Sequence, residues 1–338
     1  MNPGVGGDPA TGEVSGAFYC VANARHFIGA VALLNSVRLT GHDEPFHLVD
    51  AGLTDDQRAL LADHVTFLQA PAGVPPVHLA PYGPRQRPAD VQVIIDADII
   101  VTRPLTELIE AGRAGRLVGF VNDPPNHDRF FPEWRSALDL GPLRRRPYLN
   151  AGLFVLPRAL NAVVLDAWIA GQGRTGTAAT RYGSARLSDP FYFADQDVVN
   201  AVIAARVGDE VLDIREHRLA PHPPFRALAL QNPADLRCQY PDGARPFLLH
   251  HTMEKPWLGA CRTSPYSTLL SRLLIGEDLV VPLDPRTLPL RLREGRLASA
   301  DRYRADRQRF VKDELRRRLG VFGLRTRLAA HRQREIHG

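Results

Sequence analysis

The run VQVIIDADIIV, residues 91–101, restricts the possible folds of this 338-residue chain more than any other stretch. Seven of its eleven residues are Val or Ile, the composition of a strand that is buried on both faces. Strands of this kind belong to sheets that helices cover on both sides. Asp96 and Asp98 interrupt the run, and an ionised acid is costly to bury without a partner or a metal ion. The run therefore predicts a helix-covered sheet with a polar site near the end of this strand.

Apolar runs alternate with helical patterns along most of the chain, which predicts an α/β fold built from βαβ units. Strands are predicted at residues 18–22, 46–50, 65–70, 117–121, 147–157 and 246–251. Helices are predicted over residues 27–37 with Gly41 as the stop, after the capping-box pair Thr54 and Gln57, over 103–112, and from Asp195 as an N-cap to 206. We therefore expect a disordered segment at 1–16, one main α/β domain over 17–262, and a helical, basic C-terminal region over 263–338.

The cysteine content and the lack of targeting patterns predict the cellular compartment of the protein. The cysteines Cys20, Cys238 and Cys261 lack metal-type spacing, and an odd, sparse set is typical of a reducing compartment. The chain has no signal-peptide pattern and no run near the ~20 apolar residues that span a bilayer, so the expected location is cytoplasmic.

The positive charge of the chain lies in its C-terminal tail. The last 38 residues carry 12 basic and 5 acidic side chains, whereas the whole chain has a net charge of only +5. A basic amphipathic helix suits an anionic membrane surface, so the tail predicts peripheral contact with the inner membrane face. An ordinary solvated helix or a dimer contact is the alternative. Nucleic-acid binding is not expected, because no recognised module accompanies the charge.

The motif Asp96-Ala97-Asp98 favours a metal–phosphate site. Carboxylates two residues apart on a strand project to the same side. Mg²⁺ and Mn²⁺ prefer oxygen ligands and commonly share them with substrate phosphates. In open α/β sheets, ligands bind at the carboxyl ends of strands. The alternative is a turn with capping or solvated acids, since a second such motif occurs at Asp195 and Asp197.

The stretch PFLLHHTMEKPW, residues 246–257, offers the groups that could complete such a site. The imidazole of His250 or His251 could form an Asp/Asp/His metal set. Lys255, one of only two lysines in the chain, could neutralise a phosphate. A solvated loop charge is the alternative for this lysine.

Four stretches in order, the DAD strand end, YLNAGLFVLP, DQDVVNAV and LLHHTMEKPW, resemble the family 8 glycosyltransferases, the galactosyltransferase and glycogenin group. The resemblance covers residues 17 to 258. It implies the GT-A fold, a Rossmann-like mixed central sheet with helices on both faces. It also implies metal-dependent, retaining transfer of a sugar from a nucleotide-diphosphate sugar, with a UDP-sugar expected, to a hydroxyl acceptor. The cofactor would be Mn²⁺ or Mg²⁺.

The resemblance also implies roles for individual residues. The metal ligands would be Asp96, Asp98 and His250, or His251 because the spacing to Lys255 is one residue shorter than in the family. The donor-binding residues would be Ala22, Asn23, Arg85, Ala97, Asn150, Ala151 and Lys255. Asp195, Gln196 and Asp197 would lie at the face of the reacting sugar. Asp123 would lie on the sugar or acceptor side. Apart from the resemblance, Phe131 and Trp134 in the aromatic loop after residue 121 could form an acceptor wall, because aromatic rings stack on sugars; packing of the loop is the alternative.

Two other functions share this type of sheet. A sugar-1-phosphate nucleotidyltransferase is one, although CVANARHF after the first strand lacks a Gly-rich nucleotide loop. A catalytically silent nucleotide-sugar-binding module is the other. The sequence leaves open whether the acceptor is a saccharide, a lipid-linked glycan or a small natural product. It also leaves open whether retention uses a covalent intermediate or same-face attack.

Overall fold

The computed structural model describes residues 15–311, apart from 125, 253, 260–262, 294, 302, 305, 306 and 308–310. The predictions for the N-terminal lead-in fall almost entirely outside the described residues, as do those for Cys261 and for most of the basic tail.

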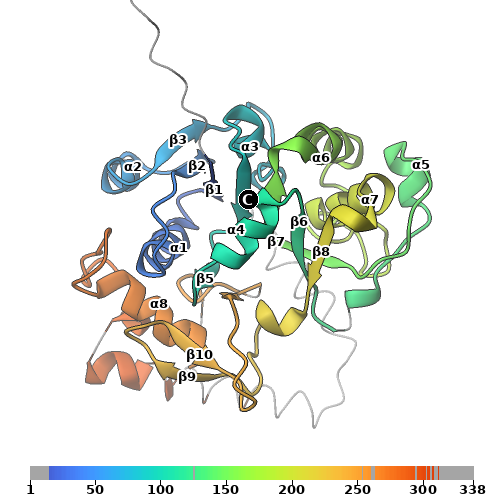
Figure 1. Ribbon diagram of the computed structural model, residues 1–338. Coiled ribbons are helices and arrows are strands. Elements are labelled where there is room, and N and C mark those ends of the chain that lie inside the picture. The colour runs from blue at the N-terminus through green and yellow to red at the C-terminus, as the bar shows by residue number, and fades with distance from the viewer. Residues whose placement is uncertain are drawn as a thin grey trace, which may run out of the picture.

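A seven-stranded mixed sheet forms the centre of the molecule, with helices packed on both of its faces (Figure 1). Its strand order is β3-β2-β1-β4-β7-β6-β8. In chain order these strands are β1 Ala17–Ala22, β2 Phe46–Asp50, β3 Thr66–Gln69, β4 Val91–Ile95, β6 Leu117–Val121, β7 Leu149–Pro157 and β8 Leu212–Arg215. All neighbours pair in parallel except β7, which runs antiparallel to both β4 and β6. The predicted mixed α/β sheet is confirmed.

The apolar run at residues 91–101 is not one strand. It divides into β4 and β5 (Ile99–Val101), and a turn closed by a 3.2 Å hydrogen bond from the Ile99 N–H to the Asp96 carbonyl separates them. Strand β5 leaves the central sheet and pairs antiparallel with β11 (Leu248–His250). This break decides the geometry of the polar site, because the pairing sets His250 opposite Ile99 and therefore next to Asp98.

The helices bury two separate sets of side chains against the two faces of the sheet. Helices α1 (Phe27–Leu39), α4 (Thr106–Arg113) and α8 (Pro265–Ile275) pack on one face. Helices α5 (Trp134–Leu138), α6 (Asn161–Thr175) and α7 (Asp195–Arg206) pack on the other. In β4, Val93 and Ile95 enter the first core while Ile94 enters the second, as the alternation of side chains along a strand requires.

Smaller elements complete the fold. They are helices α2 (Asp55–Leu61) and α3 (Tyr82–Gln86) and the hairpin of β9 (Ala229–Asn232) and β10 (Arg237–Gln239). The capping box of Thr54 and Gln57 at the start of α2 is confirmed. Asp195 is not the N-cap of α7 but its first residue. The cap is Ala194, whose φ of 52° is unusual for a residue with a side chain.

Helix α8 belongs to the main core although it follows the predicted domain boundary at residue 262. Its leucines lie in the same buried cluster as those of α1, and the amide of Asn35 in α1 donates to the carbonyl of Leu273 in α8 at 2.8 Å. The core is therefore continuous across residue 262.

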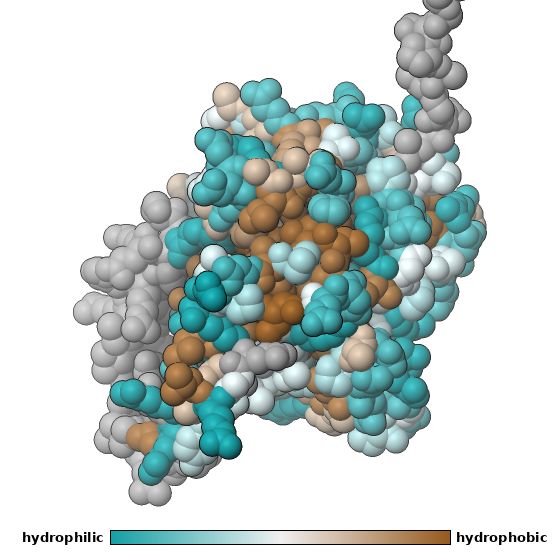
Figure 2. All heavy atoms as spheres, turned by 90° about the vertical axis from the view of Figure 1, so that its left-hand side faces the viewer, coloured by the Kyte–Doolittle hydropathy of each residue, from teal (hydrophilic) through white to brown (hydrophobic). Residues whose placement is uncertain are grey.

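Hydrophobic residues reach the surface on one side of the molecule. Figure 2 shows the left-hand side of Figure 1, where hydrophobic residues gather near the centre of the face and hydrophilic residues border them. Leu60 of α2 is among the exposed hydrophobic side chains, and the strand β3 at this edge of the sheet has no fully buried residue. Within the described part of the chain, no helix combines the length and the apolar character needed to cross a membrane.

Candidate metal and substrate site

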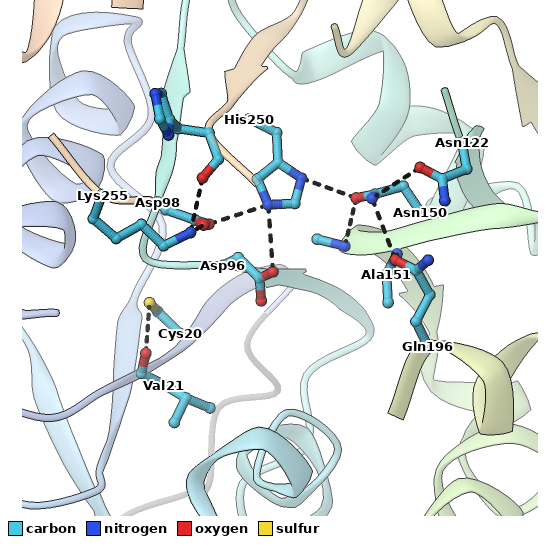
Figure 3. Close-up of polar contacts among 12 residues, drawn as sticks. Cys20, Val21, Asp96, Asp98, Asn122, Asn150, Ala151, Gln196, His250 and Lys255 are labelled. Carbon is cyan, nitrogen blue, oxygen red and sulfur yellow. Dashed lines mark hydrogen bonds and ion pairs between the residues drawn. The ribbon is translucent and has the colours of Figure 1, made fainter. Parts of the chain in front are cut away.

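Two carboxylates and an imidazole converge where β4 ends. One ligand atom from each of Asp96, Asp98 and His250 can be chosen so that all three lie within 4.8 Å of one another. The His250 Nε2 is 3.1 Å from Asp98 Oδ1 and 3.6 Å from Asp96 Oδ2 (Figure 3). The Asp98 side chain is 10% exposed and that of Asp96 is 50% exposed. Asp96 can therefore meet a ligand that arrives from solvent, while Asp98 and His250 form the buried floor.

These residues fit a divalent cation. Oxygen and imidazole ligands suit Mn²⁺ and Mg²⁺. The Asp98 Oδ1 atom is buried and accepts no hydrogen bond from the described residues. A buried carboxylate oxygen of this kind needs a compensating positive charge. Two observations therefore support a cation here: the three side chains are of the ligand types that such ions bind, and the buried Asp98 Oδ1 has no hydrogen-bond donor among the described residues.

His250, and not His251, faces the two aspartates. His251 turns away, and its ring packs against Tyr266 and Phe225 with centroid distances of 4.8 and 6.3 Å. Burial and the nearby charge of Lys255 lower the pKa of His251 to about 4. The structure thus brings the first of the two candidate histidines to the cluster.

Lys255 supplies positive charge beside the buried carboxylate. Its Nζ contacts Asp98 Oδ2 and donates to the carbonyl of His251 at 2.8 Å. Burial opposes ionisation of Asp98, but the positive charge of Lys255 beside it holds its pKa well below the usual range. For Asp96, desolvation by the surrounding protein and the negative charge of the neighbouring Asp98 carboxylate raise the pKa. The two acids therefore differ. Asp98 is ionised beside Lys255, whereas a further positive charge in the site would lower the raised pKa of Asp96 and favour its ionised form.

Strand β7 lines the opposite wall of this site through the sequence Asn150-Ala151-Gly152. Asn150 Oδ1 lies 2.9 Å from His250 Nδ1 (Figure 3). The Asn150 Nδ2 donates to Gln196 Oε1 at 3.2 Å, and the Ala151 N–H donates to the same oxygen at 3.0 Å. One polar network therefore joins His250 to the first turn of α7.

Gly152 leaves the space that the His250 ring fills. A Cβ at this position would lie 2.2 Å from His250 Cε1 and 2.5 Å from Nδ1. The Gly152 carbonyl also accepts from the Asp96 N–H at 2.9 Å, so it fixes the turn between β4 and β5. The glycine of the LNAG stretch is thus a steric requirement of the site.

We predict that Gly152→Ala lowers the free energy of unfolding by about 1–3 kcal/mol, the usual cost of forcing an extra methyl group into a packed interior. It should also weaken Mn²⁺ binding, because the ring of His250 must move. Urea unfolding and a Mn²⁺ titration measure the two effects. Gly173→Ala is the matched control, since a Cβ there, in the last turn of α6, would meet no atom of the described residues within 4 Å. Equal stability of the Gly152 variant and the wild type would contradict this prediction.

The first turn of α7 carries two acids in different surroundings. Burial and the charge of Asp96 raise the pKa of Asp195 to about 7. Asp197 is fully buried and is bonded within the protein: it accepts from Arg129 Nε at 2.6 Å, from the Tyr148 hydroxyl at 2.8 Å and from the Phe193 N–H at 2.7 Å. Among the described residues, the Asp195 carboxylate has no such set of hydrogen bonds.

The loop after β1 lies at the expected nucleotide end of the sheet. β1 and β4 are parallel neighbours, and the crevice beside their carboxyl ends is the usual ligand site of an open α/β sheet. Ala22 is buried at the end of β1, and Asn23 Oδ1 accepts from the N–H groups of Arg25 and His26. The Trp257 Nε1 donates to the Arg25 carbonyl at 2.7 Å. The segment that carries Lys255 is thus tied to this loop.

Two other predicted donor contacts occupy different positions. Ala97 is buried in the turn between the two aspartates, and its carbonyl would lie 2.3 Å from a Cβ added to Gly29 of α1. Helix α1 therefore packs directly beneath the turn. Arg85 of α3 instead pairs with Asp166 of α6 at 2.6 Å, with both side chains about half exposed.

The predicted acceptor residues divide between the site and the core. Asp123 Oδ1 lies 3.6 Å from His222 Nδ1, and the His222 ring packs edge-on against His250 with a centroid distance of 5.2 Å. One intervening ring, that of His222, therefore separates Asp123 from His250. Trp134 is 1% exposed and its Nε1 donates to the Pro190 carbonyl, whereas Phe131 is half-buried against it. Both aromatic rings take part in packing the second core.

Two residues near the site, Asn122 and Arg181, were not predicted from the sequence. Asn122 accepts from Asn150 Nδ2 at 3.4 Å, and it follows a predicted strand directly, which is a usable signal. Arg181 carries no motif. Its positive charge lowers the pKa of both Asp96 and Asp195, and its buried Nε has no hydrogen-bond partner among the described residues. Only the folding of the loop before α7 brings this arginine to the acids.

No protein-family model and no curated protein sequence matches the chain significantly. Solved structures do resemble it. The glycosyltransferase GlyE of Streptococcus pneumoniae TIGR4 has 12% identity and a TM-score of 0.50, over 77% of this chain and 60% of its own. The galactosyltransferase LgtC, in complex with donor and acceptor sugar analogues, has 15% identity and a TM-score of 0.48, over 78% and 98%. The bifunctional glycosyltransferase WbbM has 13% identity and a TM-score of 0.49, over 81% and 51%. At 12% identity the likeness to GlyE shows a shared fold alone, the GT-A fold of glycosyltransferases.

Proposed function

We propose that this protein is a divalent-metal-dependent glycosyltransferase that moves a sugar from a nucleotide-diphosphate sugar to a hydroxyl acceptor. The observation that carries the proposal is the convergence of Asp96, Asp98 and His250 at the carboxyl end of β4, with Lys255 bonded to Asp98. A site with three metal ligands and one ammonium group suits a diphosphate, which binds a cation and hydrogen-bond donors together. The GT-A fold is consistent with this chemistry.

A bound Mn²⁺ or Mg²⁺ would act as a Lewis acid on the departing diphosphate. Asp96, Asp98 and His250 would hold it. Lys255 contributes a second positive charge from a side chain that is only 17% exposed, and its contact with Asp98 aims the ammonium group into the site. Arg181, whose charge acts on Asp96 and Asp195, would add to the positive field around the donor.

At the nucleotide end, we assign Ala22 and Asn23 to the donor because they lie at the carboxyl end of β1, which is the parallel neighbour of β4. A UDP-sugar is the donor we propose first. Ala97, Asn150 and Ala151 would line the path from diphosphate to sugar, since the turn and the β7 wall border the metal ligands. Arg85 remains a proposed donor contact that would have to leave Asp166 to reach it.

At the sugar end, we propose retention of anomeric configuration, as in the family 8 glycosyltransferases that the sequence motifs resemble. Gln196 uses its carbonyl oxygen to accept from Asn150 and Ala151, so we assign it to positioning the reacting sugar. Asp195 is the carboxylate best suited to the sugar face, and Asp197 would hold the helix start in place. In same-face attack the leaving phosphate takes the proton of the acceptor, and no protein base is required. Asp123 would contact a saccharide or other hydroxyl acceptor.

A panel of nucleotide sugars, tested for hydrolysis and binding with Mn²⁺, with Mg²⁺ and with EDTA, tests the proposal. We expect metal-dependent release of a nucleoside diphosphate from at least one donor. The absence of both binding and turnover across the panel would contradict it. Release of inorganic diphosphate from a nucleoside triphosphate and a sugar-1-phosphate would instead indicate a nucleotidyltransferase.

We predict that Lys255→Met lowers kcat/KM by about 10²–10³-fold, the typical loss when one preorganised charge-stabilising group is removed. The cause is the loss of positive charge at the leaving diphosphate and beside the ionised Asp98. Steady-state donor hydrolysis measures the effect. Lys255→Arg keeps the charge in a different geometry and should lose less activity than the methionine variant. A methionine variant as active as the wild type would remove Lys255 from the mechanism.

A further inference from the structure

We infer that Asn150 is a positioning residue that selects the Nδ1–H tautomer of His250 and so makes Nε2 available as a metal ligand. The inference rests on the proposed metal-dependent function. It gives Asn150 a task within the protein, in addition to any contact with the donor.

The first step is the orientation of the Asn150 amide. Its Oδ1 accepts from the backbone N–H of Gly152 at 2.9 Å. A backbone N–H can only donate, so the oxygen and not the nitrogen of the amide must point this way. Its Nδ2 points to two further acceptors, Gln196 Oε1 and Asn122 Oδ1. Every hydrogen-bonding atom of the amide therefore has a partner that agrees with one orientation.

The second step is the tautomer of His250. The same Asn150 Oδ1 lies 2.9 Å from His250 Nδ1, and both side chains are buried. Since an amide oxygen cannot donate, Nδ1 must carry the proton. In the neutral ring Nε2 then holds the free lone pair.

The third step concerns what Nε2 faces. It lies 3.1 Å from Asp98 Oδ1, the buried oxygen that receives no hydrogen bond among the described residues. Two lone-pair atoms in contact repel each other unless a cation or a proton lies between them. A metal-bound histidine commonly donates its other ring N–H to an orienting oxygen, and here that oxygen belongs to Asn150.

The network explains why an amide, and not a smaller side chain, occupies this place on β7. Asn150 Oδ1 lies 2.9 Å from His250 Nδ1, and Asn150 Nδ2 donates to Gln196 Oε1 at 3.2 Å. It therefore couples the metal ligand to the first turn of α7. Loss of Asn150 should disturb the ligand without removing any of the three metal-binding side chains.

The test measures Mn²⁺ affinity of the full-length protein by electron paramagnetic resonance, without any substrate. We expect Asn150→Ala to bind Mn²⁺ about 10–100-fold more weakly than the wild type, the usual effect of removing an orienting partner. Asn150→Asp keeps an oxygen that accepts from Nδ1–H and from Gly152 but loses the donations to Gln196 and Asn122, so it should bind Mn²⁺ more tightly than Asn150→Ala. Asn200→Ala is the matched control: this buried asparagine bonds the backbone of Leu149 on the same strand but does not touch His250. Its variant should melt earlier and bind Mn²⁺ normally.

A second readout follows the ring itself. Nitrogen-15 NMR of histidine-labelled protein with Mg²⁺, assigned by the signal lost in His250→Ala, should show a protonated Nδ1 in the wild type and a mixture of tautomers in Asn150→Ala. If Asn150→Ala binds Mn²⁺ like the wild type, or if Asn150→Asp binds it no more tightly than Asn150→Ala, the inference is overturned. If the wild type itself binds no divalent cation, the proposed function fails instead. The protonation state of Nδ1, recorded without metal in the wild type and the alanine variant, then still decides the role of Asn150.

Discussion

Replacing Asp98 with alanine should lower kcat/KM for the nucleotide-sugar donor by at least about 10³-fold, equivalent to roughly 4 kcal/mol of transition-state stabilisation. Three losses coincide in this variant. The site loses a carboxylate of the metal cluster, His250 loses its neighbour at 3.1 Å, and Lys255 loses the acid that aims it. Initial rates at saturating Mn²⁺, combined with Mn²⁺ titration, separate loss of the ion from loss of orientation.

A control is needed because Asp98 is buried. Asp90→Ala removes an acid at the other end of β4 that pairs with Arg158 at 3.8 Å, and both of those side chains are about half exposed. This variant should keep full activity. A thermal melt of the Asp98 variant shows whether the fold is retained. A folded Asp98→Ala protein with activity within tenfold of the wild type would contradict the assignment of the metal site.

Replacing Arg129 with methionine should lower the free energy of unfolding by about 3–5 kcal/mol, because it leaves a buried carboxylate without its counter-charge. The Arg129 side chain is 7% exposed and that of Asp197 is fully buried, and two guanidinium nitrogens contact the carboxylate at 2.6 and 3.0 Å. Arg129 also donates to the carbonyls of Leu187 and Asp189 and so fixes the loop that leads into α7. Urea unfolding of the wild type and the variant measures the loss.

The design includes a matched surface pair and a double variant. Arg113→Ala breaks the exposed pair with Glu110 on α4 and should change stability by less than about 1 kcal/mol. Arg129→Met combined with Asp197→Asn removes the unpaired charge and should recover part of the loss. If Arg129→Met costs no more than Arg113→Ala, the buried pair does not support the start of α7.

Much of the fold could be predicted from local patterns. The alternation of apolar runs with helical spacing predicted an α/β sheet of βαβ units, and the apolar run at 91–101 predicted helices on both of its faces. The capping box of Thr54 and Gln57 marked the start of α2. These signals are local, because side-chain periodicity and capping act within a few residues. The break within residues 91–101 was not predicted, since Ile99–Val101 has the same composition in either sheet and only its pairing with Leu248–His250 draws it away.

The candidate site was predictable in its residue types but not in its internal bonds. The motifs marked Asp96, Asp98 and Lys255 as possible partners although they lie far apart in the chain. The alternation of side chains along a strand decides which of the two adjacent histidines lies beside the aspartates. His250, the last residue of β11, points to them, and His251, which follows it, points to the other side. Arg181 had no pattern at all, because a single arginine in a loop has no periodicity by which to recognise its neighbours.

The sequence by itself determined the class of the fold and the chemistry available at the end of its central strand, because burial, periodicity and residue type are local properties. The tertiary structure decided how that chemistry is arranged. It pairs β5 with β11 so that His250 meets Asp98, and it sets the β7 wall so that Asn150 meets His250 at 2.9 Å. The tertiary structure also pairs Asp197 with Arg129 in the interior, whereas Asp195 lies close enough to Asp96 for the Asp96 charge to raise its pKa. These outcomes depend on contacts between residues far apart in sequence, where only the packing of the whole chain selects one partner over another.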